Sequence, residues 1–455
     1  MTGLTGRSLA YRILRRFDPM RSFIAESLAK ELHKTHEPQR CTDLVCGTLR
    51  HRHALDRVIV ALGGRPIKRI STHLISVIRV GTYELCFCVQ TPPYSVVNEA
   101  VEFVKGRAGS KQVAFVNAVL RQIGRGIKHR SIGLDQANEA ATLMTGPTQG
   151  CEFQQAVFPD PRQDQSAYLA GCFSLPEWLI RSWLAEFGYE TTRTICLASN
   201  RRPGVYLRTN TVRTSDAGLM QALKGHDKSP MLVEAGLIGV AGSGNIAQLP
   251  GFNDGCFSVQ DRTAYRVAKR LNPKGSERIL DYCAAPGGKT THLAELTLDQ
   301  ACICATDSDG KRLQRVAQNV RRLGLKSVQT IEFNGVMEYV RTHGPFDAVL
   351  ADVPCSNTGV LAKRLEVRYR ITPKDIGQLQ TIQQGILVKV ADLVRPQGRP
   401  CYSTCSIQPE ENSHCVKTFL ARDTRFTLEQ ESLILPSAHS PDCDGGYYAM
   451  LVRTE

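Results

Sequence analysis

The chain has little of what marks a membrane or secreted protein. None of its apolar stretches approaches the ~18 residues that a membrane-spanning helix requires. The first 16 residues are basic, but they contain neither an apolar signal-peptide core nor a cleavage site. We therefore expect a cytoplasmic protein with no membrane partner.

Cysteine is too sparse for a disulfide scaffold, with 16 residues in a chain of 455. The pairs Cys86/Cys88 and Cys302/Cys304 lie within apolar segments, where free cysteine behaves as a small hydrophobic residue. No paired CxxC or Cys/His spacing of a zinc site occurs, so we expect no metal. Most of the cysteines are expected to be inert core residues, because buried thiols in apolar surroundings are unreactive.

Acidic residues are scarce only in the first part of the chain. Residues 1–130 hold 22 Lys and Arg against 9 Asp and Glu, a net charge of +13 out of +14 for the whole chain. Such asymmetry indicates nucleic acid or another anionic surface as a partner. A solvated basic helical face would give the same counts, and charge alone does not separate the two interpretations.

A length of 455 residues exceeds one ordinary domain, and the patterns along the chain divide it into four parts. Residues 1–130 show helical spacing of apolar residues and predict a helical bundle. Residues 131–165 are polar and rich in Gly, Gln and Pro, which is typical of a linker. Residues 166–255 predict a small α+β subdomain, and residues 256–455 a catalytic α/β domain.

Strand and helix patterns alternate from residue 278 onward, which predicts a mostly parallel sheet with helices on both faces. A helix is expected at 409–421 and a terminal antiparallel hairpin from 425–428 and 447–452. The expected strands that precede them are 278–283, 301–306, 327–332, 346–351 and 400–403.

Two cysteines follow buried strands directly. Cys355 lies in Asp352-Val353-Pro354-Cys355-Ser356, and Cys405 lies in Ser403-Thr404-Cys405-Ser406. Ligands of a doubly wound sheet bind outside the carboxyl ends of its strands. Both thiols should therefore meet beside the ligand, and their polar neighbours argue against a core position.

A glycine turn follows the first strand of this domain, at Gly287-Gly288. Such a turn lets the backbone approach a ligand, although it also fits NAD, other nucleotides or plain helix–strand packing. Asp307 lies about 20 residues further on, where an acid can bind ribose hydroxyls or merely cap a helix. Neither GxGxxG nor a P-loop is present, so an adenosine cofactor with one ribose remains, and S-adenosylmethionine fits.

A thiol beside a methyl donor suggests covalent activation of a pyrimidine. Carbon 5 of a pyrimidine is not nucleophilic until a thiolate adds to carbon 6, after which carbon 5 can accept a methyl cation. One cysteine as the nucleophile is the minimum, and a second polar group can assist release. Activation requires that local charge or a polar neighbour lower the thiol pKa from about 8.5.

The chain resembles the Sun-type (nucleolar-protein/Fmu) family of RNA cytosine-carbon-5 methyltransferases over nearly its whole length. Residues 1–130 are similar to the NusB-like RNA-binding helical domain, and this pairing resembles the bacterial subgroup that methylates small-subunit (16S) ribosomal RNA. The matching motifs are Cys283-Ala284-Ala285-Pro286-Gly287-Gly288-Lys289-Thr290, Asp352-Val353-Pro354-Cys355-Ser356 with Thr358-Gly359-Val360, Tyr402-Ser403-Thr404-Cys405-Ser406 with Pro409-Glu410-Glu411-Asn412, Leu207-Arg208-Thr209-Asn210 and Gln260-Asp261.

The resemblance implies a Rossmann-like class I methyltransferase fold with a seven-stranded sheet, and a monomer acting on ribosomal RNA, free or in an early assembly intermediate. It implies Cys405 as nucleophile and Cys355 as the group that assists release. The residues that it places along S-adenosylmethionine are Cys283, Ala284, Ala285, Pro286, Gly287, Gly288, Lys289, Asp307, Asn334 and Asp352.

Two positions depart from the family pattern. Asn334 stands where the subgroup usually has an Asp, and its amide oxygen still offers a contact to an adenine amino group. The run Lys363-Arg364-Leu365-Glu366 lacks the family's Pro, which leaves the path of that loop open.

Three other functions compete with ribosomal RNA methylation. A transfer-RNA enzyme of the same family is the nearest, and only the NusB-like domain argues against it. A non-enzymatic NusB-like RNA-binding factor would leave both strand-end cysteines without a purpose. A DNA cytosine methyltransferase would use the Pro-Cys thiol and carry a large insert that is not seen after Cys355.

Overall fold

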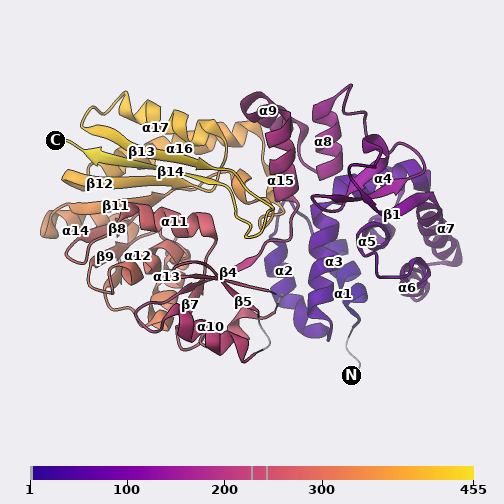
Figure 1. Ribbon diagram of the computed structural model, residues 1–455, viewed down its shortest axis with the longest axis horizontal. Helices are drawn as coiled ribbons and strands as arrows, with labels where there is room; N and C mark the ends of the chain where they lie inside the picture. The colour runs from indigo at the N-terminus through magenta and orange to yellow at the C-terminus, as the bar shows by residue number, and fades with distance from the viewer. Residues whose placement is uncertain (1–3, 227–228, 242–243) are drawn as a thin grey trace. The chain divides into compact units, whose positions relative to one another are not determined.

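The computed structural model describes residues 4–226, 229–241 and 244–455, so the first three residues of the predicted helical domain lie outside the described residues. The chain forms two compact units. The first comprises Met1–Arg201 and Leu361–Arg370, and the second comprises Arg202–Val360 and Ile371–Glu455 (Figure 1).

A helical bundle opens the first unit and confirms the helical spacing predicted within residues 1–130. Val97, Ala100 and Val104 are buried at helical spacing on one face of α6. The bundle helices are α1 (Gly6–Arg16), α2 (Ile24–Glu31), α3 (Pro38–Arg50), α4 (Arg52–Gly63), α5 (Thr72–Phe87), α6 (Pro93–Lys105) and α7 (Ser110–Gly126), with 3-10 turns η1 (Leu32–Lys34) and η2 (Ile67–Arg69).

A small antiparallel sheet follows α7 in place of the predicted linker. It consists of β1 (Ile127–Gly133), β2 (Thr142–Met144) and β3 (Gln149–Phe153) in the order β1-β3-β2, with η3 (Glu139–Ala141) between the first two strands. The strands are short, and β1 pairs with β3 with shifts in register. The Gln and Gly residues of these strands interrupt the alternation of apolar and polar residues by which a strand is predicted from sequence.

Two further helices and a returning segment complete the first unit. Helix α8 (Gln165–Phe173) precedes α9 (Glu177–Ser199), which is kinked at Gly188. Because both helices belong to the first unit, the boundary after Arg201 falls inside the predicted 166–255 subdomain. The returning segment Leu361–Arg370 contains the short helix α15 (Val367–Arg370).

The buried Arg368 fixes that returning segment in the first unit. Its guanidinium donates to Arg50 O at 2.7 Å, to Asn200 Oδ1 at 2.8 Å and to Ser199 O at 3.0 Å. Burial lowers the pKa of Arg368 to about 10. The departure from the family pattern at 363–366 therefore lies in a segment that packs within the first unit.

The second unit begins with a four-stranded antiparallel sheet in the order β5-β6-β4-β7. A cluster of buried residues that includes Leu207, Leu223 and Phe257 packs the sheet against α10. The elements are β4 (Val205–Thr209), α10 (Asp216–Lys224), β5 (Pro230–Glu234), β6 (Leu237–Val240), η4 (Ile246–Gln248) and β7 (Phe257–Val259).

The seven-stranded sheet that follows confirms the predicted fold class. Its order is β10-β9-β8-β11-β12-β14-β13, with parallel pairing from β10 to β12 and an antiparallel terminal hairpin. The strands are β8 (Arg278–Asp281), β9 (Cys302–Ala305), β10 (Val328–Thr330), β11 (Phe346–Asp352), β12 (Val394–Thr404), β13 (Phe426–Ile434) and β14 (Gly446–Arg453).

Helices cover both faces of this sheet, as alternation along β11 requires. Ala348 and Leu350 pack into the core under α11–α13, whereas Val349 and Ala351 pack into the opposite core under α14, α16 and α17 (Figure 1). The helices are α11 (Arg262–Leu271), α12 (Gly288–Leu296), α13 (Gly310–Leu323), α14 (Val336–His343), α16 (Pro373–Ala391) and α17 (Ser413–Leu420), with η5 (Phe333–Gly335), η6 (Thr358–Val360) and η7 (Pro409–Glu411).

Candidate active site at the carboxyl edge of the sheet

The two strand-end cysteines meet where neighbouring parallel strands end. Asp352 at the end of β11 lies opposite Ser403 of β12 in the ladder, so the loops that follow leave the sheet side by side. Cys355 Sγ and Cys405 Sγ are 3.0 Å apart, and the Cys405 amide donates to Cys355 Sγ at 3.3 Å. The predicted convergence of the two thiols is thus confirmed.

The thiols have unequal surroundings. The hydrogen bond with Cys405, burial and the nearby charges of Cys405 and Glu411 all raise the pKa of Cys355 well above its usual value. Cys355 therefore keeps its proton at neutral pH and can donate it to the sulfur of Cys405. The Cys405 thiol in turn is 3.2 Å from Asn357 Oδ1.

Glu411 ties the two cysteine loops together, a role that the sequence did not reveal. Its fully buried carboxylate accepts hydrogen bonds from Ser356 N at 2.8 Å, Ser406 Oγ at 2.5 Å and Gln383 Nε2 at 3.0 Å, and also from the Ser356 hydroxyl. Ser356 and Ser406 directly follow the two cysteines. One carboxylate thus fixes the loops on which both thiols stand.

The glycine turn lies next to these loops, between β8 and α12. Gly287 has φ 98°, in the left-handed region, and a Cβ on it would approach Val316 Cγ1 to 3.1 Å. A Cβ on Gly288 would meet open space. Gly288 starts α12, so its backbone can face a ligand at the positive end of the helix.

Lys289, on α12, places a positive charge near the thiols. Its Nζ is 2.6 Å from Asp352 Oδ2, while Ser403 Oγ donates to Asp352 Oδ1 at 2.7 Å. Burial lowers the pKa of Lys289, but Asp352, Cys405 and Asp281 together raise it above its usual value. The protonated amine therefore lies where it stabilises negative charge on Cys405.

Asp307 follows β9 and is 4% exposed. It accepts hydrogen bonds from Ala285 N at 3.1 Å and Asp309 N at 3.0 Å, which hold the glycine loop and the start of α13. Arg312 Nη1 also lies 3.7 Å from Asp307 Oδ1. A carboxylate has about four acceptor positions, so acceptor capacity remains for a ligand. Asp309, not Asp307, caps α13.

The remaining predicted positions divide into two groups. Cys283, Ala284, Ala285 and Pro286 form the backbone between β8 and Gly287, and burial raises the pKa of the Cys283 thiol. Asn334 lies in η5 after β10 and is exposed. Its side chain has no hydrogen-bond partner within the described ranges.

The residues present fit an adenosylmethionine cofactor. Asp281, at the end of β8, accepts a hydrogen bond from Thr290 Oγ1 at 2.7 Å through one oxygen, and its other oxygen is buried without a partner. Burial raises the pKa of Asp281 to about 7. An unpartnered buried carboxylate oxygen suits a cationic donor group on a ligand.

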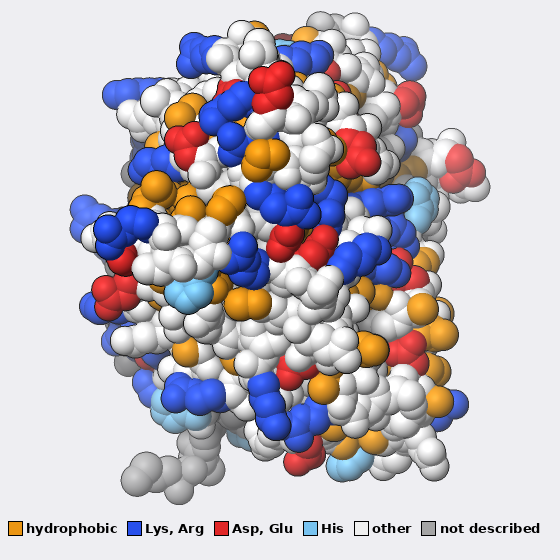
Figure 2. Space-filling view, turned by 90° about the vertical axis from the view of Figure 1, so that its left-hand side faces the viewer, with side chains coloured by type: hydrophobic (Ala, Val, Ile, Leu, Met, Phe, Trp, Pro, Cys, Tyr) orange, Lys and Arg blue, Asp and Glu red, His pale blue; other side chains and the backbone are white. Residues whose placement is uncertain are grey.

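No three His, Cys, Asp or Glu side chains cluster to hold a metal among the residues that the structure describes. No helix within the described part of the chain is long and apolar enough to cross a membrane. Figure 2 shows a face on which Lys and Arg are interspersed with Asp and Glu, without a large field of one sign.

The first unit carries a concentrated basic surface. A cavity of about 600 Å³ beside α1 and α2 is lined by several cations and, among the described lining residues, by one acid, Glu31. Glu31 pairs with Lys34 at 2.7 Å. The other cations are Arg12, Arg15, Arg16, Lys30 and Arg107.

Comparison with known families accounts for most of the chain. Residues 268–443 match the family described as 16S rRNA methyltransferase RsmB/F. Residues 5–125 match the NusB family, and residues 175–235 match a ferredoxin-like domain of RsmF/B-like methyltransferases.

Similar solved structures show the fold. One crystal structure, at 24% identity, superposes with a TM-score of 0.74 over 98% of each chain. The structure of NSun6 from Pyrococcus horikoshii with SFG, at 23% identity, superposes with a TM-score of 0.54 and covers 62% of this chain and 98% of that one.

Curated relatives match along almost the full length. A probable ribosomal RNA small subunit methyltransferase B from Synechocystis is 34% identical, and the alignment covers 98% of this chain and 96% of the relative. A ribosomal RNA small subunit methyltransferase B from Klebsiella pneumoniae is 31% identical over 90% of this chain and 89% of the relative. This chain therefore belongs to the 16S rRNA methyltransferase RsmB/F family.

Proposed function

We propose that this protein makes 5-methylcytosine in small-subunit ribosomal RNA through a covalent bond between Cys405 and the base. The observation that supports this best is the pair of thiols 3.0 Å apart beside the Lys289–Asp352 ion pair. A methyltransferase acting on a ring nitrogen or a hydroxyl would need no nucleophilic thiol, because those atoms already carry a lone pair.

The two thiols take different roles in this proposal. Cys405 adds to carbon 6 of the cytosine, and carbon 5 then becomes nucleophilic enough to accept a methyl group. Water then takes the proton from carbon 5, the electron pair of that C–H bond restores the ring double bond, and the Cys405–carbon 6 bond breaks with its electron pair on the Cys405 sulfur. Cys355 keeps its proton before attack and assists this last stage, as its raised pKa allows.

Charge around Cys405 assists the attack. Lys289 stabilises the thiolate, and Asp352 holds Lys289 while presenting a carboxylate at the edge where the base must lie. S-adenosylmethionine supplies a methyl group on a sulfonium when bound. The residues that would hold it are the 283–289 loop and Asp307, with Asn334, on η5 after β10, as a further candidate.

The target is proposed to be ribosomal RNA, free or in an early assembly intermediate, bound by a cytoplasmic monomer without a metal. The half-buried Cys405 thiol reaches carbon 6 only when the base has left its stack, at a cost of roughly a few kcal/mol. An unpaired cytosine should therefore react faster than the same base in a stable duplex.

Bisulfite sequencing of RNA from cells with and without the protein tests the target. Loss of one methylated cytosine in small-subunit ribosomal RNA is expected. Loss of a methylated cytosine in transfer RNA alone would favour the transfer-RNA enzyme, and an unchanged pattern in both RNAs would contradict the proposal.

The two cysteines are separated by single substitutions. Cys405→Ala is expected to abolish methylation and to form no adduct. Cys355→Ala should still attack and methylate but release slowly, so that a protein–RNA adduct survives denaturing electrophoresis. An adduct trapped by Cys405→Ala and absent from Cys355→Ala would reverse the roles.

A further inference from the structure

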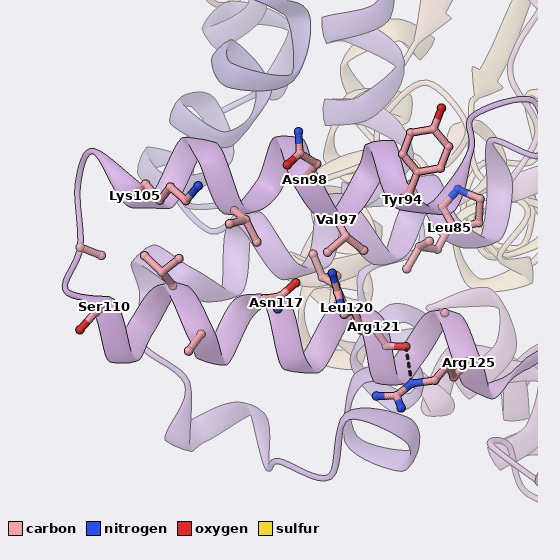
Figure 3. Close-up of a pocket in the computed structure, with 16 residues that line it drawn as sticks. Leu85, Tyr94, Val97, Asn98, Lys105, Ser110, Asn117, Leu120, Arg121 and Arg125 are labelled. Carbon is pink, nitrogen blue, oxygen red and sulfur yellow. Dashed lines mark hydrogen bonds between the residues drawn. The ribbon is translucent and has the colours of Figure 1, made fainter.

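A large cavity in the first unit lies between α6 and α7. It has a volume of about 1090 Å³ and is lined along both helices (Figure 3). Figure 3 shows the two helices running side by side, with Val97 and Leu120 between them. We call this feature the α6–α7 groove.

The floor of the groove is apolar, and its accessible wall mixes apolar and polar side chains, among them Pro93, Val113 and Asn98. Val97 is 8% exposed, and Leu85 and Leu120 are fully buried. Tyr94, in contrast, is 77% exposed. An amphipathic protein helix would bind through its apolar face, whereas the charged residues that line the groove favour an anionic partner.

The groove has the charge of an anion-binding surface. Its charged lining residues are Lys105, which pairs with Glu102, and Arg121 and Arg125, and no acid lines it among the described residues. The Arg121 side chain has no hydrogen-bond or ion-pair partner within the described part of the chain, and Arg125 bonds only the Arg121 carbonyl, at 3.4 Å. These guanidinium groups are therefore available to phosphates.

Two side-chain amides add the means to recognise bases. Asn98 on α6 and Asn117 on α7 both line the groove (Figure 3). Neither amide has a hydrogen-bond partner among the residues with described positions. An amide can both donate to and accept from a base edge, and the exposed ring of Tyr94 can stack on a base face.

We infer that the α6–α7 groove binds a single-stranded segment of the substrate RNA, with bases on Tyr94 and the two amides and phosphates on Arg121 and Arg125. The inference rests on the proposed function for its RNA. It adds a contact that recognises unpaired bases, beyond the general attraction of the basic first unit. A stable duplex cannot offer base faces to Tyr94, so the groove should favour unpaired RNA.

The test uses the full-length protein and a fluorescent single-stranded RNA of about a dozen nucleotides, compared with a duplex of the same sequence. Fluorescence anisotropy at several salt concentrations gives the affinity and its salt dependence. The groove variants are Tyr94→Ala, Asn117→Ala and Arg121→Ala. Lys111→Ala is the matched control, since Lys111 is exposed on α7 and does not line the groove.

Each variant has its own expected signature. Tyr94→Ala should weaken single-strand binding about tenfold, equivalent to ~1.4 kcal/mol, without changing the salt slope. Arg121→Ala should reduce that slope by about 0.7, the value for one phosphate on a single strand. Asn117→Ala should weaken single-strand binding, and Lys111→Ala should stay within twofold of wild type.

Two results would overturn the inference. One is single-strand affinity of Tyr94→Ala within twofold of wild type, as expected if the groove holds a protein helix. The other is an equal loss on the duplex, which would indicate phosphate attraction alone. Methylation of small-subunit RNA by the same wild-type preparation tests the proposed function separately, because that activity can be present while the groove variants bind normally.

Discussion

Replacing Glu411 tests whether one buried carboxylate sets the geometry of the two thiols. Glu411 accepts from Ser356 N and Gln383 Nε2 through Oε1, and from the hydroxyls of Ser356 and Ser406 through Oε2. Glu411→Gln keeps the shape and one acceptor oxygen. Glu411→Ala removes both.

The loss of unfolding free energy depends on which hydrogen-bond donors lose their acceptor. In Glu411→Ala the Ser356 amide and the Gln383 side chain stay buried without one, at about 1–3 kcal/mol each, so unfolding free energy should fall by ~2–6 kcal/mol. In Glu411→Gln the two hydroxyls can rotate to accept from the new amide. Charge-assisted bonds then become neutral, and the loss should be about 1–2 kcal/mol.

The methylation rate of Glu411→Gln should fall further than its loss of unfolding free energy explains. A misplacement of about 1 Å can cost ~100-fold in rate. Single-turnover methylation by Glu411→Gln, measured well below its unfolding midpoint, should therefore fall about 10- to 100-fold. Affinity for S-adenosylmethionine should stay within twofold, because Asp307 and the glycine turn have separate contacts.

Glu410→Gln is the matched control, since Glu410 is the adjacent acid and lies outside this hydrogen-bond network. Urea unfolding and single-turnover rates would be compared for both variants. Equal rates for Glu410→Gln and Glu411→Gln would refute a positioning role for Glu411. A fall in cofactor affinity that matches the fall in rate would refute it as well.

Three further substitutions probe the cofactor edge and the returning segment. Asp307→Ala should weaken S-adenosylmethionine binding at least tenfold (~1.4 kcal/mol) by calorimetry, a typical loss for a hydrogen bond to a charged group, and unchanged affinity in a folded variant would remove Asp307 from the site. Burial raises the pKa of the Asp281 carboxyl from 3.8 to about 7, so the folded state binds the carboxyl proton more tightly than the unfolded state. The contribution of Asp281 to the free energy of unfolding therefore falls as pH rises from about 4 to about 7. Asp281→Asn should remove this dependence and be more stable than wild type at pH 8 by up to a few kcal/mol, and parallel urea curves at pH 5 and pH 8 would contradict this. Arg368→Met should lower unfolding free energy by about 3 kcal/mol or more, because the carbonyls of Arg50 and Ser199 lose a buried donor, whereas the exposed neighbour Arg364→Met should change it by less than about 1 kcal/mol.

The approach of the two thiols was predictable because it follows from the order of strands in the sheet. Residues at the carboxyl ends of adjacent parallel strands share one edge, whatever the length of chain between them. Cys355 and Cys405 therefore meet across 50 positions, and Asp352 meets Ser403 in the same way. Strand alternation in residues 278–404 needed only apolar runs and turns, which are local signals.

The role of Glu411 could not be read from local pattern. At the start of a predicted helix, Glu410 and Glu411 looked alike, since acids are common in a first helical turn. In the structure Glu411 is fully buried and bonds Ser356, which lies 55 positions earlier. Only the packing of two loops from different strands distinguishes the two acids.

The returning segment 361–370 shows a second limit of sequence patterns, and it decides how RNA binding should be tested. The segment starts directly after Val360, at the end of the loop that carries Cys355, yet it belongs to the first unit. Deleting residues 1–130 would remove Arg50, one partner of the buried Arg368 guanidinium, and so expose a segment continuous with the thiol loop. Loss of methylation after that deletion would therefore not show that the helical unit binds RNA. Single substitutions on the unit's surface, which leave Arg368 buried, separate RNA binding from the integrity of the loop.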